Sequence, residues 1–322
     1  MPQPATQLTR ELIEAARTRL AGKVHVTPVL NSATLDAQRG AQLFFKCENF
    51  QKGGAFKARG ATNAVFALSE EQARCGVVTH SSGNHAAALA RAARLRGIRA
   101  YVVMPDNTPQ AKRAAVARYG AEITWCAPTL AAREETARAV LAATGATLVH
   151  PYDDLTVMAG QASCAVEFLQ QVPGLDAILC PVGGGGLISG TAFAAKTLNP
   201  AIRIQGIEPA GADDAARSFR EGRIVAGGTP HTIADGLRGQ LGARPFAEIR
   251  RYVDDITTVS EADIVRAMRE VWEVLKIVIE PSAAVPYAGL LGELPQALRG
   301  RRVGVILTGG NLDLERLPWG TG

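Results

Sequence analysis

Short runs of β-branched residues alternate with alanine-rich amphipathic segments, and this alternation constrains the fold of the chain more than any other feature. It predicts a first series of strands and helices at 76–80, 84–96, 99–104, 109–119, 122–126, 130–143 and 147–150. Consecutive strand–helix units need a parallel sheet, because each helix returns the chain to the same edge before the next strand starts. We therefore expect an α/β fold of open, mostly parallel sheets flanked by helices.

The alternation resumes after Pro151 and continues almost to the end of the chain. It predicts helices at 157–171, 187–198 and 260–276, and strands at 176–182, 202–207 and 302–307. Ser260 is suited to be the N-cap of the third helix. No low-complexity linker divides the sequence. We expect a small α/β domain at 75–151, inserted into a larger domain formed by residues 1–74 and 152–322.

The composition is that of a globular protein with a large core. Of the 322 residues, 47% are hydrophobic and 20% are charged, and the formal net charge is +5. The arginines are spread among alanines rather than gathered with aromatic residues, which favours solvated helix faces over a nucleic-acid site. No apolar stretch is long enough to cross a bilayer, and the first twenty residues lack the apolar centre of a signal peptide. The five cysteines include no CxxC pair, which favours a reducing cytoplasm.

Lys57 is the first candidate functional residue, because it stands among small and apolar residues in the segment 53–60, Gly-Gly-Ala-Phe-Lys-Ala-Arg-Gly. Burial disfavours the ammonium form and lowers the pKa of an amine. Such a lysine can attack an aldehyde or accept a proton near neutral pH. The plain alternative is a surface lysine at a helix end, and the flanking glycines weaken that alternative.

A run of four glycines, Gly183–Gly186, follows a predicted strand and opens a predicted helix. Without side chains, the backbone amides of such a run can converge on one anion, and the helix dipole adds partial positive charge. The run is therefore a candidate phosphate site. A dinucleotide loop is the alternative, but Glu208 lies slightly too far along the chain to be its acidic residue.

The segment 81–85, Ser-Ser-Gly-Asn-His, also follows a predicted strand and opens a helix. Its amides and hydroxyls suit a carboxylate, although an ordinary N-cap would explain part of it. Together with Lys57 and the glycine run, it indicates a cofactor with an aldehyde and a phosphate, which is pyridoxal 5′-phosphate (PLP). Thr308, after the last strand, is placed to bond a ring nitrogen. Because a hydroxyl does not keep that nitrogen protonated, it favours prompt β-elimination.

The segment 208–214, Glu-Pro-Ala-Gly-Ala-Asp-Asp, places carboxylates and a carbonyl on one turn after a strand. Hard oxygen ligands suit Mg²⁺ or Ca²⁺. The plain alternative is a solvated acidic turn.

The motifs taken together resemble the serine racemase and serine/threonine dehydratase family of fold type II PLP enzymes, whose two-domain fold is similar to that of the tryptophan synthase β subunit. The resemblance extends over nearly the whole chain. The segments that carry it are 25–30, 44–48, 79–85, 159–161, 181–186, 232–236, 253–256, 279–283 and 308–311.

The resemblance implies a role for each cofactor-binding residue. Lys57 would carry the covalent link to PLP, and Phe56 would pack on the cofactor ring. Asn84 would meet the 3′ oxygen of the ring, Gly183, Gly184, Gly185 and Gly186 would hold the phosphate, and Thr308 would meet the ring nitrogen.

The resemblance also implies substrate and metal sites. Ser81, Asn84 and His85 would hold the substrate carboxylate. Glu208, Asp214 and the Ala212 carbonyl match the divalent-metal site of the family. Ser82 stands where racemases of the family have serine and plain dehydratases often have alanine, and it would be an acid/base on the face opposite Lys57.

These features lead us to expect an ammonia-lyase that converts L-serine or L-threonine to a 2-oxo acid and ammonia. The alternatives are a serine racemase with dehydratase side activity, a dehydratase of threo-3-hydroxyaspartate, and a dinucleotide-binding protein without enzymatic activity. We expect a cytoplasmic homodimer that acts on a small hydroxy amino acid and has no nucleic-acid or membrane partner.

Overall fold

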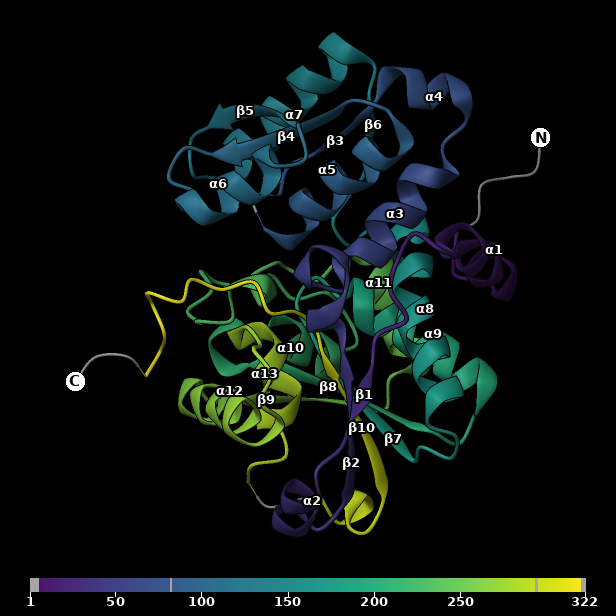
Figure 1. Cartoon of the computed structure of the whole chain (residues 1–322), viewed down its shortest axis with the longest axis vertical. Coiled ribbons are helices and arrows are strands. Elements are labelled where there is room, and N and C mark those ends of the chain that lie inside the picture. The colour runs from purple at the N-terminus through teal and green to yellow at the C-terminus, as the bar shows by residue number, and fades with distance from the viewer. Residues whose placement is uncertain (1–5, 82, 293–294, 320–322) are drawn as a thin grey trace.

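The computed structural model of the protein describes residues 6–81, 83–292 and 295–319. It contains two mostly parallel sheets flanked by helices, so the predicted α/β class is confirmed. In Figure 1 the smaller sheet lies above the larger one, and helix α3 (Lys57–Ala67) packs against a helix from each part. None of the helices in the described ranges is long and apolar enough to cross a membrane.

The larger sheet has six strands, in the order β1 (Val29–Leu30), β2 (Gln42–Cys47), β10 (Arg302–Leu307), β7 (Ala177–Pro181), β8 (Arg203–Pro209) and β9 (Asp255–Val259). Strand β1 is antiparallel to β2, and the other pairs are parallel. The carboxyl ends of the five parallel strands therefore share one edge, which is where open α/β sheets bind ligands. Thr308 follows β10 and Gly183 follows β7, so the topology brings both to this edge.

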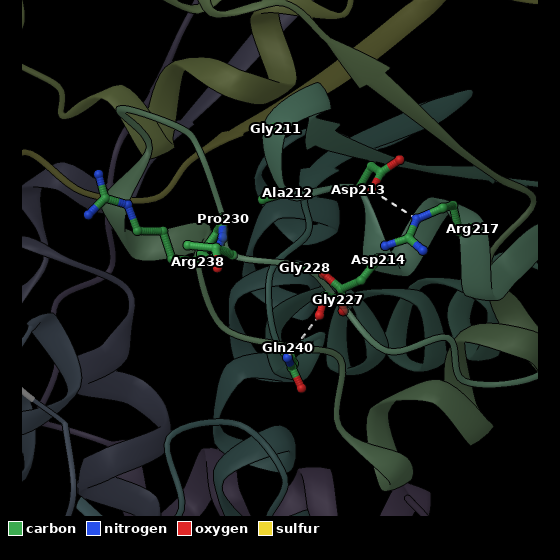
Figure 2. A pocket seen from close by; sticks show the side chains of 11 residues that line it. Gly211, Ala212, Asp213, Asp214, Arg217, Gly227, Gly228, Pro230, Arg238 and Gln240 are labelled. Carbon is green, nitrogen blue, oxygen red and sulfur yellow. Dashed lines mark hydrogen bonds and ion pairs between the residues drawn. The ribbon is translucent and has the colours of Figure 1, made fainter. Parts of the chain in front are cut away.

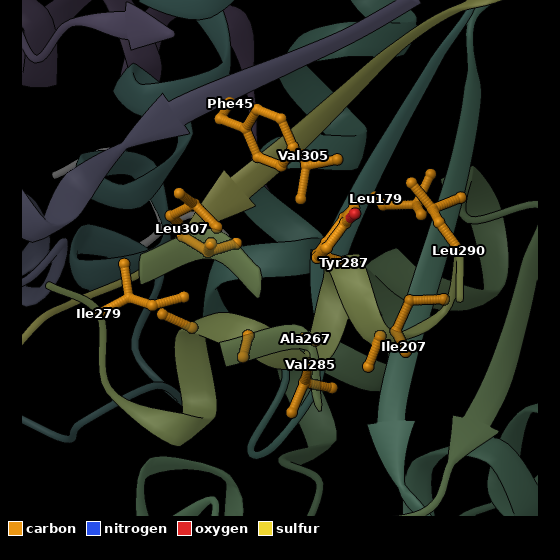
Figure 3. Packing of buried hydrophobic residues seen from close by; sticks show 14 of the residues in the cluster. Phe45, Leu179, Ile207, Ala267, Ile279, Val285, Tyr287, Leu290, Val305 and Leu307 are labelled. Atoms are coloured by element: carbon orange, nitrogen blue, oxygen red, sulfur yellow. The ribbon is translucent and has the colours of Figure 1, made fainter. Parts of the chain in front are cut away.

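Helices cover both faces of the larger sheet. On one face lie α12 (Glu261–Leu275) and α13 (Pro281–Ala288), and on the other lie α8 (Leu155–Gln171), α9 (Gly186–Leu198), α10 (Asp214–Glu221) and α11 (Ala243–Tyr252). Side chains of a strand alternate between the faces, so Val305 and Leu307 face α13 while Ile306 faces α8. Figure 3 shows Phe45, Val305 and Leu307 around Tyr287, whose ring meets that of Phe45 edge to face at 5.5 Å.

The smaller sheet has four parallel strands, in the order β5 (Glu122–Cys126), β4 (Ala100–Pro105), β3 (Val77–Thr79) and β6 (Thr147–Leu148). Helices α5 (Asn84–Arg96) and α6 (Gln110–Ala117) cover one face, and α7 (Leu130–Thr144) covers the other. All four strands lie within 77–148. The division of the chain into domains at residues 75 and 151 stays a prediction.

The remaining helices pack around these layers. Helix α1 (Arg10–Leu20) packs on α8, α2 (Ala33–Arg39) precedes β2, and α4 (Glu70–Cys75) precedes β3. Short 3-10 turns are η1 (Glu48–Phe50), η2 (Lys52–Gly54), η3 (Ala210–Ala212), η4 (Asp235–Leu237) and η5 (Gln296–Leu298).

Most predicted elements are confirmed, with shifted ends. The helix expected from residue 157 begins at Leu155, because the Asp154 carboxylate accepts from the Thr156 N–H at 2.7 Å and caps it. Ser260 is the N-cap of α12, as predicted. Strand β2 was not expected, because Lys46 interrupts its apolar pattern. The structure buries Lys46 and lets its amine donate to carboxylate and amide side chains of α8.

Candidate active site

Lys57 is the first residue of α3 and lies at the carboxyl edge of the larger sheet. The turn before it, η2, contains two glycines whose φ angles are 70° and 75°, in the left-handed region that favours glycine. The N–H of Phe56 donates to the Thr308 carbonyl at 3.0 Å. This bond fixes the start of α3, and with it Lys57, beside the end of β10.

The amine of Lys57 is enclosed without a carboxylate partner in the described part of the chain. Its Nζ donates to the Pro151 carbonyl at 2.8 Å, just beyond the smaller sheet, and lies 5.1 Å from the Phe56 ring centroid. Burial lowers the pKa of Lys57 to about 8. A useful fraction of the amine is therefore neutral near physiological pH, as a nucleophile or base requires.

A buried ionic cluster, formed by Arg59, Glu48, Glu167 and Lys46, holds α3 in place. The Arg59 guanidinium donates to both carboxylate oxygens of Glu48, at 2.8 and 2.7 Å, and to Glu167 at 3.0 Å. Glu167 also pairs with Lys46. Burial alone would raise the pKa of Glu48, but the Arg59 charge and its hydrogen bonds hold that pKa below its usual value. Two cations balance two carboxylates here, so the cluster is complete without a ligand.

The glycine run after β7 is tightly enclosed, so a side chain at these positions would collide with neighbouring residues. A Cβ atom on Gly184 would lie 2.4 Å from the ring of Tyr152. One on Gly183 would lie 2.9 Å from the Leu237 backbone. Gly185 has a φ of 87° and immediately precedes α9. The loop can therefore take this path only with glycine.

The loop also presents unused hydrogen-bond donors. In the described residues, the N–H groups of Gly183, Gly184 and Gly185 donate to no protein acceptor. They stand at the N-terminus of α9, where the helix dipole favours an anion. Free amides at a helix N-terminus, facing the same edge as Lys57, fit a cofactor that carries both a phosphate and an aldehyde.

The predicted carboxylate-binding segment lies at the carboxyl end of β3 and the start of α5. Ser81 Oγ accepts from the Gly83 N–H at 3.4 Å, and Ser82 lies outside the described residues. His85 is buried, with Nε2 3.2 Å from the Val149 carbonyl, and its Nδ1 has no partner in the part of the chain described. Burial, and next the Lys57 charge, hold the pKa of His85 well below its usual value.

Asn84, at the start of α5, contacts Glu280, the N-cap residue of α13, which lies in the segment 279–283 that carries the resemblance but for which no role was predicted. The Asn84 side-chain amide donates to the Glu280 carboxylate at 2.9 Å and accepts from Asn311 at 3.0 Å. Burial, and next the charge of Asp235, raise the pKa of Glu280 to about 8. The structure thus brings Asn84, Lys57, Thr308 and the glycine run to one region, but their roles toward a cofactor stay predictions.

The acidic turn lies apart from Lys57, at the end of β8. Both carboxylate oxygens of Glu208 accept from backbone amides, of Ala215 at 3.2 Å and of Ala216 at 2.8 Å. The Asp214 carboxylate accepts from the Leu241 N–H at 2.8 Å. Burial raises the pKa of Glu208 to about 8 and also raises that of Asp214. Neither carboxylate forms an ion pair among the described residues, although the Arg217 charge opposes the rise in the pKa of Asp214.

Figure 2 shows the pocket of about 370 Å³ beside this turn. Ala212, Asp213 and Asp214 line it, and Asp213 pairs with Arg217 at 2.9 Å, whereas Asp214 forms no ion pair among the described residues. The described residues contain no cluster of three or more metal-ligating side chains. A cation here would need backbone carbonyls and waters to complete its ligands, which suits Mg²⁺ or Ca²⁺.

Two further residues at the edge of the smaller sheet were missed by sequence reasoning. His150 contacts the rings of His80 and Tyr152, with centroids 5.4 and 4.6 Å away. Burial, and next the His80 charge, lower the pKa of His150 to about 4. Tyr152 packs against the glycine loop. Their position just after β6 was the available signal, because parallel strands end at a common edge.

The family model described as "Pyridoxal-phosphate dependent enzyme" matches residues 20–309. The chain is 53% identical over 311 residues to a β-hydroxyaspartate dehydratase of Paracoccus denitrificans, with 97% of this chain and 98% of that protein covered. It is 48% identical to a serine racemase of Arabidopsis thaliana, with 95% and 93% covered. Among solved structures it is similar to maize serine racemase, with a TM-score of 0.93 and 47% identity over 95% of this chain and 94% of that one.

Proposed function

Because this chain belongs to the family of pyridoxal-phosphate dependent enzymes, we propose that it is an ammonia-lyase for small amino acids with a hydroxyl group on Cβ. The observation that carries the proposal is the Lys57 amine, enclosed without a carboxylate and with its pKa lowered to about 8. L-Serine, L-threonine and 3-hydroxyaspartate all carry the required hydroxyl group.

The residues at the site fit PLP. Lys57 would hold its aldehyde, the amides of Gly183, Gly184 and Gly185 its phosphate, and Thr308 its ring nitrogen. When bound, PLP supplies a carbonyl that links to the substrate amine and a ring that withdraws electrons from Cα.

The residues of the chain then perform the elimination. Ser81, Asn84 and His85 hold the substrate carboxylate, so that the Cα–H bond faces Lys57. The Lys57 amine accepts the Cα proton, the electron pair of that bond forms the Cα–Cβ double bond, and the Cβ hydroxyl leaves with a proton as water. The enamine that is released hydrolyses to a 2-oxo acid and ammonia.

The proposal extends to a divalent cation. Glu208, Asp214 and the Ala212 carbonyl would hold Mg²⁺ or Ca²⁺ at the end of β8. Glu208 and Asp214 are buried and form no ion pair in the described part of the chain, which supports this assignment, because a cation relieves the cost of burying them charged.

A substrate panel tests the lyase proposal. The purified PLP-loaded enzyme is incubated with L-serine, D-serine, L-threonine and L-threo-3-hydroxyaspartate, and both the 2-oxo acid and ammonia are measured. We expect equimolar oxo acid and ammonia from at least one L-substrate. Release of neither product from any member of the panel would overturn the proposal.

Serine racemisation is a second candidate, because a racemase of Arabidopsis thaliana is 48% identical to the chain and the chain has Ser82. Racemisation needs a proton donor on each face of Cα, whereas elimination needs a base on one face. We expect D-serine as a minor product from L-serine. Ser82→Ala should abolish it while some elimination remains, and the D-serine to pyruvate ratio measures this. An unchanged ratio would remove Ser82 from the reaction.

A further inference from the structure

The turn 150–153, just after β6, contacts two separate parts of the candidate active site. The Pro151 carbonyl accepts from the Lys57 amine at 2.8 Å. The next residue, Tyr152, packs its ring on the glycine loop, where a Cβ atom on Gly184 would lie 2.4 Å from three atoms of that ring. One short stretch of backbone therefore carries a contact to the proposed catalytic lysine and a contact to the proposed phosphate site.

Tyr152 is closely packed against its neighbours. A Cβ atom on Gly186 would lie 2.9 Å from the Tyr152 Cα, and one on Gly239 would lie 3.3 Å from the Tyr152 ring. The His150 ring meets the Tyr152 ring edge to face, with centroids 4.6 Å apart. Because close-packed interiors transmit strain, a displacement of Tyr152 would displace the glycine loop.

The shape of the turn depends on one side-chain atom, Nδ1 of His150. This nitrogen accepts from the N–H groups of Tyr152 at 3.4 Å and of Asp153 at 2.9 Å. A ring nitrogen that accepts carries no hydrogen, so the hydrogen of this imidazole is on Nε2 and the ring is neutral. Burial lowers the pKa of His150 to about 4, so the ring keeps this form at neutral pH.

The two bonds to Nδ1 are the internal hydrogen bonds of the turn. Pro151 has no N–H. In the described residues, neither the Tyr152 N–H nor the Asp153 N–H donates to another acceptor. The Asp153 carboxylate accepts from the Arg244 N–H at 3.1 Å, which anchors only the far end of the turn. The orientation of the Pro151 carbonyl and of Tyr152 therefore depends on the His150 acceptor.

We propose that His150 is a positioning residue that sets both anchoring points of the cofactor, the Lys57 amine through the Pro151 carbonyl and the glycine loop through Tyr152. This inference rests on the proposed function, which places PLP between these two points. The Pro151 carbonyl holds the amine whenever it is not attached to the cofactor, and so keeps the base in the site for proton transfer. Loss of the Nδ1 acceptor should weaken phosphate binding and slow proton transfer together.

Three substitutions separate the acceptor from the ring. His150→Asn keeps an amide oxygen close to the position of Nδ1 but loses the ring, and His150→Phe keeps a ring without an acceptor. His150→Gln carries its amide further out, toward the position of Nε2, and is a second loss variant in case His150→Phe does not fold. His25→Phe is the matched control, because His25 is exposed and its Nδ1 lies 3.0 Å from the Phe50 carbonyl, outside the site.

Cofactor binding is measured by titrating the full-length, cofactor-free protein with PLP and with pyridoxal, which has the same ring and aldehyde but no phosphate. Wild type should prefer PLP, and His150→Phe and His150→Gln should reduce this preference by about tenfold, because the displaced loop receives the phosphate poorly. At saturating PLP, the kcat for 2-oxo acid release should also fall about tenfold in both, because the base is held less well. His150→Asn and His25→Phe should keep both the preference and the kcat.

Circular dichroism identifies the variants that fold, and the comparison uses those. Equal behaviour of His150→Asn and a folded loss variant would overturn the positioning role, and so would a wild-type preference and kcat in His150→Phe or His150→Gln. A better result for His150→Phe than for His150→Asn would also overturn it, because it would show that only the ring matters. Absence of 2-oxo acid from wild type with every substrate, with a PLP preference that still depends on the Nδ1 acceptor, would overturn the lyase proposal alone.

Discussion

Two strands of the larger sheet end near a buried glutamate, Glu48 after β2 and Glu208 in β8, and their surroundings differ in charge. Glu48 accepts two hydrogen bonds from Arg59, and burial and pairing together leave its pKa lowered. Glu208 accepts only backbone amides, lies near the acidic Asp214, and has its pKa raised to about 8. The Arg59 charge balances the Glu48 carboxylate, whereas no cationic side chain in the described ranges forms an ion pair with Glu208.

The difference suggests a rule for this molecule: charged groups that are paired within the protein stabilise the fold, and charged groups without such a partner bind ligands. The ionic cluster around Arg59 is balanced and orients α3. Lys57 and the pair Glu208 and Asp214 form no ion pair among the described residues, and the proposed function completes each of them with a molecule from outside the chain. A compensated group should affect folding when it is removed, and an uncompensated one should affect ligand binding.

The largest expected effect follows removal of the uncompensated amine. Lys57→Ala should lower lyase activity by about 10³-fold or more, because the covalent anchor and the base are lost together. Lys52→Ala, in the turn before α3, is the matched control and should keep the activity. The measurement is 2-oxo acid release under saturating PLP. Near-normal turnover by Lys57→Ala would exclude it as the catalytic lysine.

Removal of a compensated charge should instead destabilise the fold. Arg59→Met leaves Glu48 buried without its partner and should lower the free energy of unfolding by about 3–5 kcal/mol. Arg269→Met breaks an exposed pair with Glu273, whose side chains are 59% and 60% exposed, and should cost less than about 1 kcal/mol. Denaturant unfolding of both variants measures the difference. Equal effects would show that the cluster is not structural.

The lowered pKa of Lys57 predicts a pH dependence of cofactor attachment. Only the neutral amine attacks an aldehyde, and the pKa is about 8. The attachment rate of PLP to the cofactor-free protein should rise about tenfold per pH unit below 8 and level off above it. Stopped-flow absorbance measures the rate. A rate that still rises tenfold per unit from pH 8 to 10 would indicate an ordinary solvated lysine.

The smallest expected effect concerns the acidic turn. Chelation should lower the melting temperature by about 2–4 °C for each kcal/mol of cation binding lost, and Mg²⁺ or Ca²⁺ should restore it. Asp214→Asn should remove this response, whereas Asp213→Asn, which breaks only the pair with Arg217, should keep it. Calorimetry in chelator and in excess cation measures the response. A melting temperature independent of chelator would leave the turn as plain surface.

Local patterns predicted much of this molecule. The parallel sheets follow from the alternation of strands and helices, and Gly183 and Thr308 were placed at a sheet edge because each follows a strand. The enclosure of Lys57 was predicted from its neighbours, and the lowered pKa agrees with it. These features depend on residues close together in sequence, which is why the sequence was sufficient.

Residues whose significance depends on distant partners were missed. Glu280, the N-cap residue of α13, meets Asn84 at the start of α5, so its place at the site depends on two segments that are far apart in the chain. Strand β2 was missed because the polar Lys46 lies in it, and burial of that amine becomes understandable only when Glu167 of α8 is seen beside it. Hydrogen bonds and ion pairs between distant segments form only in the folded chain, so the sequence alone did not reveal them.

The central claim, that the uncompensated Lys57 amine is the attachment point of PLP, is tested most directly by chemical trapping. The purified protein is loaded with PLP, reduced with borohydride, digested and examined by peptide mass spectrometry. The account predicts a stoichiometric pyridoxyl-phosphate label on Lys57, with Lys46, Lys52 and Lys112 unlabelled. A label on another lysine, or none on Lys57 at saturating PLP, would contradict it.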